Sequence, residues 1–382
     1  MTQVSDPIEF HRRSRGKITI SSKTPLDADN LSIVYTPGVG AVSTRIAEQP
    51  DEVRELTGKQ NTVAIVTDGT AVLGLGDIGP EAALPVMEGK AAIFSEFAGI
   101  NAVPICLATT DTDAIVQTVR YLAPGFGGVN LEDISAPRCF EIERRLTEDL
   151  DIPVFHADQH GTAIVVLAGL INALKVTGKG HDVRIAISGA GAAGLAIAHL
   201  LVAYGLTAIR ISDSKGVLTL DRTNINHDQR EVLALSTADE SWPIGGSLID
   251  GADVFIGVSK AGLFTAEDIR RMAPDPIVLA LANPVPEIMP DEARAGGAIV
   301  VATGRSDFPN QINNALVFPG LFRGLLDHRV PRVTTDIKIV VAEALAALVS
   351  EPDAEHIVPS IFDTRIVSGI ADAIGACQGQ RC

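Results

Sequence analysis

The sequence predicts an α/β protein of two domains, and three observations support this fold class. Hydrophobic residues make up 46% of the 382 residues and aromatic residues only 4%, so the core must be mainly aliphatic. From Val63 onward, short β-branched segments alternate with helical patterns, which is typical of parallel strands covered by helices. A glycine-rich turn at 189–194 then separates a predicted strand from a predicted helix.

The first predicted domain, residues 1–160, is an N-terminal α/β domain, which contains the candidate catalytic and metal-binding residues described below. Its first 30 residues are polar and irregular, as expected of an arm that packs on the body or on a neighbouring subunit. The remainder divides into strands at 62–69 and 101–110, helices at 80–99 and 138–150, and a strand with its loop at 152–161.

The second predicted domain, residues 161–320, is Rossmann-like with a parallel sheet and contains the glycine-rich turn, a candidate dinucleotide site. A polar loop at 178–182 separates its first helix from a second α/β unit. The domain divides into a helix at 162–176, strands at 183–188, 208–213, 252–258, 276–283 and 298–304, and a helix from the glycine turn to Tyr204. In residues 321–382, two helical patterns at 336–350 and 361–376 are expected to pack back on the body.

Charge and composition argue against several classes of partner. Lys and Arg number 31 against 47 Asp and Glu, a net charge of −16, so the surface repels nucleic acid and anionic lipid. The apolar stretch 183–206 resembles a membrane span, but its glycines, Ser188 and His199 favour a strand, a tight turn and a helix.

The expected location is the cytoplasm. The first residues lack the apolar core of a signal peptide, and the four cysteines, which show no metal-like spacing, are expected to be free thiols. We therefore expect a small-molecule substrate and neither a nucleic-acid nor a membrane partner.

The glycine-rich turn is a candidate dinucleotide site. It consists of Gly189, Ala190, Gly191, Ala192, Ala193 and Gly194. In such a site the first glycine permits the turn, the second admits the pyrophosphate, and the third lets the helix pack on the strand. The alternative is a tight turn without a ligand.

The choice between NAD and NADP stays open from the sequence. Asp213 ends the next predicted strand and could accept hydrogen bonds from the adenosine ribose, which favours NAD. Ser214 and Lys215 could contact a 2′-phosphate, which favours NADP, although Lys215 could equally be a solvated turn residue.

Three carboxylates, Glu132, Asp133 and Asp158, interrupt or end apolar stretches. Carboxylate oxygens suit Mg²⁺ or Mn²⁺, although these acids could also serve as helix N-terminal or loop charges. Adjacent strand residues point to opposite faces, so Glu132 and Asp133 can share an ion only at a strand end or in a loop. His156 and His160 could suggest zinc, but hydrogen bonding within the loop is the preferred interpretation.

Two further residues are candidates for proton transfer. Lys90 lies in an otherwise nearly apolar segment, where it could either reach solvent or act as a base near neutral pH. Tyr35 lies in the turn YTPGVG, where a packing role is the alternative to a catalytic one.

These segments together resemble the short bacterial form of malic enzyme, and they run in the family's order over nearly the whole chain. The matching stretches are YTPGVG (35–40), TDGTAVLGLGDIGPEAALPVMEGKA (67–91), FAGINAVPICL (97–107), NLEDISAPRCFEIE (130–143), FHADQHGTA (155–163), GAGAAG (189–194), SDSKG (212–216), FIGVS (255–259), LANPVPEI (281–288) and ATGRSDFPNQINNALVFPGLFRG (302–324). The resemblance implies oxidative decarboxylation of L-malate to pyruvate and CO₂, with reduction of NAD(P)⁺ and dependence on a divalent metal. It also implies a homodimer, to which the N-terminal arm contributes.

The resemblance also assigns roles to individual residues. Lys90 would take the C2 hydroxyl proton, and Tyr35 would protonate C3 of enolpyruvate. Asn283 and Asn314 match the substrate-binding asparagines, and Asn283 also lies at the expected cofactor position. The metal ligands would be Glu132, Asp133 and Asp158.

The chain departs from the family pattern at several positions. Ala157 stands where a second aspartate is common, and Lys260 adds a charge after FIGVS. Val72 replaces the arginine that larger members use on the substrate carboxylate, so Arg305 is a candidate for the distal carboxylate. The alternatives to malate oxidation are oxaloacetate decarboxylation, malolactic conversion on the same fold, and a non-catalytic NAD(P)-sensing module.

Overall fold

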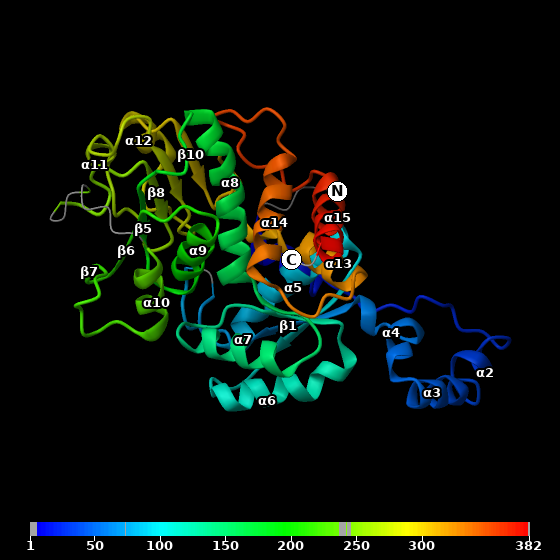
Figure 1. Ribbon diagram of the computed structural model, residues 1–382. Helices are drawn as coiled ribbons and strands as arrows, with labels where there is room; N and C mark the ends of the chain where they lie inside the picture. The colour runs from blue at the N-terminus through cyan, green and yellow to red at the C-terminus, as the bar shows by residue number, and fades with distance from the viewer. Residues whose placement is uncertain (1–5, 73, 237–241, 243–245, 381–382) are drawn as a thin grey trace.

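The computed structural model describes residues 6–72, 74–236, 242 and 246–380. Within them, two sheets, one parallel and one mainly parallel, lie in two α/β units that are joined by a long buried helix, α8 (Thr162–Thr177) (Figure 1). The chain therefore has the predicted α/β fold with two sheets.

The N-terminal sheet is entirely parallel. Its strands are β1 (Thr62–Thr67), β2 (Asn101–Cys106), β3 (Gly128–Leu131) and β4 (Val154–His156), in the order β2-β1-β3-β4. Helices α6 (Thr112–Leu122) and α7 (Arg138–Asp149) share one apolar cluster with one face of this sheet. The opposite face packs against α5 (Pro80–Ala98). Helix α6 was not among the predicted elements.

The second sheet has the Rossmann-like arrangement. Its strands are β5 (Ile185–Ser188), β6 (Ile209–Asp213), β7 (Gly216–Val217), β8 (Val254–Gly257), β9 (Ile277–Ala280) and β10 (Val300–Thr303), in the order β10-β9-β8-β5-β6-β7. All pairs are parallel except β6 with the two-residue edge strand β7. The accompanying helices are α9 (Ala192–Ala203), α10 (His227–Leu235), α11 (Ala266–Ile269) and α12 (Pro290–Ala295).

The C-terminal helices return to the N-terminal unit. They are α13 (Phe318–Asp327), α14 (Thr335–Ala347) and α15 (Arg365–Gln380). Phe94 of α5 contacts the rings of Phe318 and Phe322 at centroid distances of 4.7 and 5.4 Å. Aliphatic residues of α14 and α15 belong to the same core cluster as α8. The predicted domain limits at residues 160 and 320 stay a prediction.

The apolar stretch 183–206 contains β5 and α9, as predicted. Another helical stretch, Ala157–Thr177, is long and apolar enough to cross a membrane, but 67% of its apolar window is buried inside the protein. A buried core helix meets the same criterion. The expectation of free thiols holds for Cys106 and Cys139 but is wrong for Cys377, which is disulfide-bonded, because sequence spacing does not show which thiols the fold brings together.

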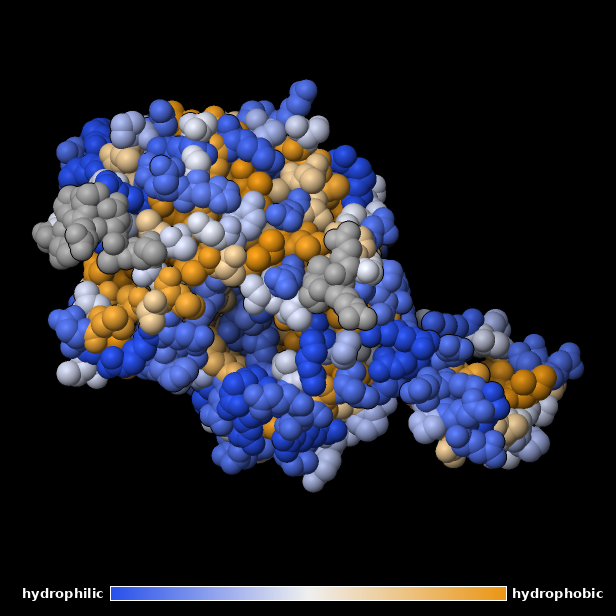
Figure 2. Space-filling view, in the orientation of Figure 1, coloured by the Kyte–Doolittle hydropathy of each residue, from blue (hydrophilic) through white to orange (hydrophobic). Residues whose placement is uncertain are grey.

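The N-terminal arm has little core of its own. It contains α1 (Pro7–Ser14), α2 (Leu31–Val34), α3 (Val39–Glu48) and α4 (Val53–Leu56), and none of these four helices has a buried residue. Helices α2 and α3 extend away from the two sheets (Figure 1), and part of the surface of this extension is apolar (Figure 2). Ile33 is 71% exposed, which leaves an apolar surface of this arm open to solvent.

Candidate active site

A pocket of about 700 Å³ lies between the two sheets, and both units contribute to its walls. Lys90 and the three predicted metal acids line it from the N-terminal unit. The second unit and the segment before α13 contribute Ala193, Ser259, Asn283 and Asn314, among others. The structure therefore brings together in one cavity the predicted base, the three acids, both asparagines and one residue of the glycine turn.

The three acids converge because they follow neighbouring parallel strands. Glu132 and Asp133 come directly after β3, and Asp158 follows β4, which pairs with β3. Asp133 has a φ of +53°, so the chain turns sharply there. The side chains of Glu132 and Asp133 therefore do not have to point to opposite faces, as they would in a strand. The backbone N–H of Asp133 donates to Asp158 Oδ2 at 2.8 Å. One potential ligand atom from each residue lies within 4.8 Å of the others.

The electrostatics of this cluster fit a divalent cation. Glu132 and Asp133 are each only 3% exposed. Burial, followed by repulsion from Asp158, raises the pKa of Glu132 well above its ordinary value, although Lys90 opposes this. Three such carboxylates are costly without a counter-charge, and their oxygens are the ligands that Mg²⁺ and Mn²⁺ prefer. The donor set therefore suits either ion.

Lys90 is a buried cation beside the acids. It lies on α5 and is only 7% exposed, so it does not extend to solvent. Its Nζ lies 2.7 Å from Glu132 Oε1 and 4.3 Å from the centroid of the Phe318 ring. Asn130 Nδ2 donates to Glu132 Oε2 at 2.9 Å and thus fixes the same carboxylate from the other side. Lys90 is thereby held in the wall of the pocket, beside the acids.

The glycine turn has the geometry that a dinucleotide site needs. Gly189 has a φ of +116°, which permits the sharp turn after β5. A Cβ on Gly194 would lie 1.7 Å from the carbonyl oxygen of Gly189, so only glycine allows α9 to start this close to the strand. A Cβ on Gly191 would meet nothing within 4 Å. Gly191 is also the N-cap of α9, where backbone N–H groups and the helix dipole favour a phosphate.

Asp213 accepts hydrogen bonds from Arg222, a residue that was not predicted from the sequence. Arg222 donates from both terminal nitrogens to the Asp213 carboxylate, at 3.1 and 2.7 Å. The backbone N–H of Lys215 donates to Asp213 at 2.8 Å. Although burial raises the pKa of Asp213, the bonds from Arg222 and Lys215 outweigh it and lower the pKa. Ser214 occupies the turn between β6 and β7. A lone arginine in a polar loop gave no signal of this role.

The two candidate asparagines both line the pocket. Asn283 follows β9, and its carbonyl oxygen would lie only 2.1 Å from a Cβ on Gly74, so the two loops touch closely. Asn314 begins a short 3₁₀ turn, but the capping hydrogen bond there comes from Asn313, whose side chain accepts from Ala315. The capping alternative thus applies to the neighbour of Asn314 rather than to Asn314 itself.

Tyr35 does not join this site within one chain. It ends α2 in the extended arm, is 66% exposed, and is not among the described residues that line the pocket. Arg305 is not among the described lining residues either: its Nε and Nη2 donate to Asp307 at 2.8 and 2.6 Å, and its Nη1 donates to the carbonyl oxygen of Pro284 at 3.3 Å. The candidate role of Arg305 for the distal carboxylate is therefore not supported. Lys260 is exposed and likewise lies outside the lining residues described.

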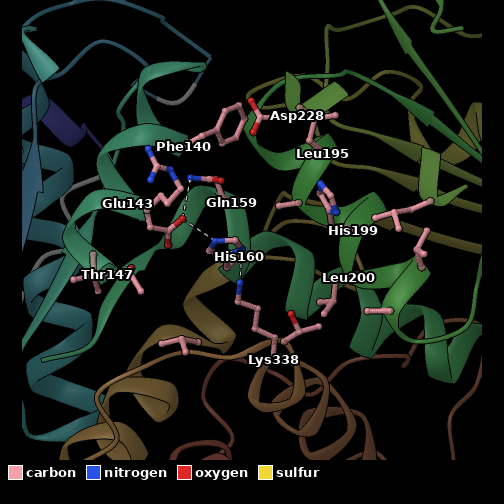
Figure 3. A pocket seen from close by; sticks show the side chains of 18 of the residues that line it. Phe140, Glu143, Thr147, Gln159, His160, Leu195, His199, Leu200, Asp228 and Lys338 are labelled. Carbon is pink, nitrogen blue, oxygen red and sulfur yellow. Dashed lines mark hydrogen bonds and ion pairs between the residues drawn. The ribbon is translucent and has the colours of Figure 1, made fainter. Parts of the chain in front are cut away.

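A second cavity, of similar size, is lined by Glu143, Gln159, His160 and Lys338, among others (Figure 3). There Glu143, His160 and Lys338 point toward one another. His160 Nε2 lies 2.8 Å from Glu143 Oε2, and His160 Nδ1 lies 3.0 Å from Lys338 Nζ. His160 therefore makes hydrogen bonds with surrounding residues. The cluster of possible metal ligands, which is formed by the three acids, contains neither His156 nor His160. Zinc is not supported here.

Comparisons with known proteins bear on the family of this chain. The family model "malic enzyme, N-terminal domain" matches residues 15–147, and the model "malic enzyme, NAD binding domain" matches residues 159–376. The NAD-dependent malic enzyme of Geobacillus stearothermophilus is 54% identical over 94% of this chain and 76% of that protein. The bifunctional malic/malolactic enzyme of Bacillus subtilis is 52% identical over 98% of this chain and 92% of that protein.

Solved structures agree with these matches. The crystal structure of the NAD-dependent malic enzyme from Thermotoga maritima has a TM-score of 0.92 at 44% identity, covering 97% of this chain and 99% of that chain. The malic enzyme from Pyrococcus horikoshii has a TM-score of 0.91 at 44% identity, covering 96% and 87%. The two family models, the sequence identities and the solved structures all agree. This chain belongs to the malic enzyme family.

Proposed function

We propose that this protein oxidatively decarboxylates L-malate to pyruvate and CO₂ and transfers the hydride to NAD⁺ or NADP⁺. The observation that carries the proposal is the buried Lys90 amine, 2.7 Å from a carboxylate of the three-acid cluster. The same pocket is lined by Ala193 of the dinucleotide turn, so cofactor and substrate would meet there. A base, a metal site and a hydride acceptor are the components that this reaction requires.

The metal would be Mg²⁺ or Mn²⁺, held by Glu132, Asp133 and Asp158. When bound, it would stabilise the negative charge that develops on the C2 oxygen. Lys90 would accept the proton of the C2 hydroxyl as the hydride leaves C2 for the nicotinamide. The C3–C4 bond then breaks, CO₂ leaves, and its electron pair passes through C3 to the C2 oxygen. Asn283 and Asn314 would orient the substrate through their amide groups without adding charge.

Tyr35 remains the proposed proton donor to C3, acting from a second subunit of a homodimer. Within one chain, Tyr35 lies on an arm that extends away from the sheets (Figure 1). The apolar residues Leu31 and Ile33 on that arm are 48% and 71% exposed, which a partner subunit would cover. The arm of one subunit can then supply Tyr35 to the pocket of the other.

Mixing two inactive variants tests this arrangement. Tyr35→Phe and Lys90→Met homodimers should each be inactive, but subunit exchange should restore activity in hybrid dimers. One of the two pockets in each hybrid would have both an intact tyrosine and an intact lysine. Absence of recovery in hybrids, verified by mass spectrometry, would contradict a site shared between subunits.

The reaction itself is tested by following reduced nicotinamide absorbance with L-malate and Mn²⁺, with pyruvate measured in parallel. Equal amounts of reduced cofactor and pyruvate, abolished by EDTA and restored by Mn²⁺, would support the proposal. The high identity to a relative named malic/malolactic enzyme makes lactate the second product to assay. Lactate without net cofactor reduction would favour the malolactic alternative. We also infer a cytoplasmic location, where malate and both cofactors are available.

A further inference from the structure

The charges in the active-site pocket leave one substrate group without a counter-charge. The three acids contribute up to three negative charges, and Lys90 must be a neutral amine when it accepts the C2 hydroxyl proton. A divalent metal and a malate dianion cancel each other, so the occupied site would retain an excess of negative charge. Placing a further carboxylate in such a site is unfavourable unless a cation lies beside it. A cation is therefore needed on the side of malate that faces away from the metal.

We propose that Lys17 binds the carboxylate of malate that is remote from the metal, an inference that rests on the proposed function. Lys17 follows α1 and lines the same pocket as Lys90 and the three acids. His11 of α1 lines it as well, so the N-terminal segment forms one wall of the active site. Because a lysine side chain carries three ammonium donors, Lys17 can bind a carboxylate and keep a bond to the protein.

The backbone and side chain of Lys17 are both anchored to α5. Its N–H donates to Glu88 Oε2 at 3.3 Å, and its Nζ donates to the carbonyl oxygen of Pro85 at 2.8 Å. The Nζ would lie 3.5 Å from a Cβ on Gly89, the residue next to Lys90. Pro85 and Gly89 are one helical turn apart and both line the pocket. The Lys17 ammonium thus lies along the same stretch of α5 that presents Lys90.

Other cations considered for this role are excluded by their positions. Arg305 is bound to Asp307 and does not line the pocket. Lys260 is exposed and is also absent from the described lining. At Val72, where larger members of the family have an arginine, the side chain is uncharged and buried. Among the described residues that line the pocket, Lys17 and Lys90 are the lysines, and no arginine is present.

The chemistry predicts which kinetic constant depends on Lys17. The carboxylate remote from the metal is C4, which leaves as CO₂ when the C3–C4 bond breaks. Its charge is present in bound malate and stays on C4 during hydride transfer, before neutral CO₂ forms. An ion pair with Lys17 therefore stabilises bound malate and the transition state for hydride transfer about equally. Removing Lys17 should weaken malate binding without slowing turnover.

The test compares Lys17→Met with Lys17→Arg and with a control, Lys23→Met, which removes an exposed lysine from the same segment. Lys17→Met should raise the KM for malate about 10- to 100-fold, the effect of losing a charge-assisted contact, with kcat within about threefold. Lys17→Arg should recover part of the affinity. Lys23→Met should match wild type.

Inhibition by oxalate separates this role from a structural one. Oxalate can occupy the metal-proximal positions of malate but has no remote carboxylate, so its inhibition constant should change less than about twofold in Lys17→Met. An unchanged KM for malate, or an equal rise in the malate and oxalate constants, would overturn the proposal. A wild-type protein that does not oxidise malate would instead refute the proposed function and, with it, this role of Lys17.

Discussion

Glu143 holds the segment that carries Asp158, one of the proposed metal ligands, and Glu143→Gln is the substitution that tests this. The Glu143 carboxylate accepts from the backbone N–H of His156 at 2.9 Å and lies 2.8 Å from His160 Nε2. Gln159 donates to it more weakly, at 3.4 Å. These three contacts lie on both sides of Asp158. A glutamine cannot reproduce them, because its amide NH₂ would face donors rather than acceptors.

The magnitude follows from the pKa of Glu143. Burial alone would raise this pKa, but the attraction of His160, its hydrogen bond, and the charge of Lys338 lower it to about 2. A carboxyl pKa lowered from 4.5 to about 2 stabilises the folded protein by about 3 kcal/mol. Because the folded-state pKa is depressed, this stabilisation is complete above pH 4.5 and is lost as the pH falls toward about 2.

Urea denaturation at pH 7 and at pH 4 measures this contribution. We expect Glu143→Gln to lower the unfolding free energy by about 3 kcal/mol at pH 7, and the difference from wild type to shrink at pH 4. Glu141→Gln, on the exposed face of the same helix, is the matched control and should change little. A difference below about 1 kcal/mol at pH 7, or one that does not depend on pH, would refute the reasoning.

The same variant should also weaken metal binding. Groups that orient metal ligands typically contribute about 10- to 100-fold in metal affinity. The Mn²⁺ concentration for half-maximal activity should therefore rise by about that factor in Glu143→Gln, and excess Mn²⁺ should restore much of the activity. Lost stability with an unchanged Mn²⁺ requirement would show that Glu143 supports the fold without positioning Asp158.

Three further predictions concern the remaining site residues. Lys90→Met should lower kcat by about 10²- to 10⁴-fold while NADH still binds, which fluorescence titration can verify; wild-type turnover would refute its role as base. Gly194→Ala should abolish cofactor binding, because its Cβ would lie 1.7 Å from the oxygen of Gly189; calorimetric titration with NADH measures this. Arg222→Gln should leave the charge of Asp213 unbalanced and disfavour a 2′-phosphate, lowering the NADP-to-NAD ratio of kcat/KM about tenfold. An unchanged ratio would place Arg222 outside cofactor selection.

The features that the sequence predicted are those with a local cause. The glycine turn depends on residues within six positions of each other, and its required geometry is confirmed at Gly189 and Gly194. The acids Glu132 and Asp158 stood out because each interrupts or ends an apolar stretch, but their spacing left a metal site open, and only the family resemblance grouped them as ligands. The structure supplies the reason that they converge: each follows one of two neighbouring parallel strands, which end at the same edge of the sheet.

The residues that were missed act through distant contacts. The backbone N–H of Lys17 donates to Glu88, 71 positions away in the sequence. The Nζ of Lys338 forms a hydrogen bond with His160 Nδ1, 178 positions away. Neither lysine stands out in composition or periodicity, because a half-buried lysine and a surface lysine have the same sequence signature. Only the packing of α1 and α14 onto the body reveals them. Tyr35 shows the converse: its motif is local, but within one chain it lies outside the pocket, so its proposed role depends on a second subunit.

The position of the pocket follows from the direction of both sheets. Glu132 follows β3 and Asp158 follows β4, while Gly189, Ser259 and Asn283 follow β5, β8 and β9 of the second sheet. In parallel sheets, the carboxyl ends of the strands are where loops diverge and ligands bind. Here the carboxyl ends of two sheets meet across one cavity, so the metal acids and the cofactor loops belong to different units. A change in the angle between the units would therefore alter the distance from the proposed substrate site to the proposed cofactor site. The cluster of three acids would stay intact, because all three belong to one unit. Closure of the two units is thus a step that could control turnover.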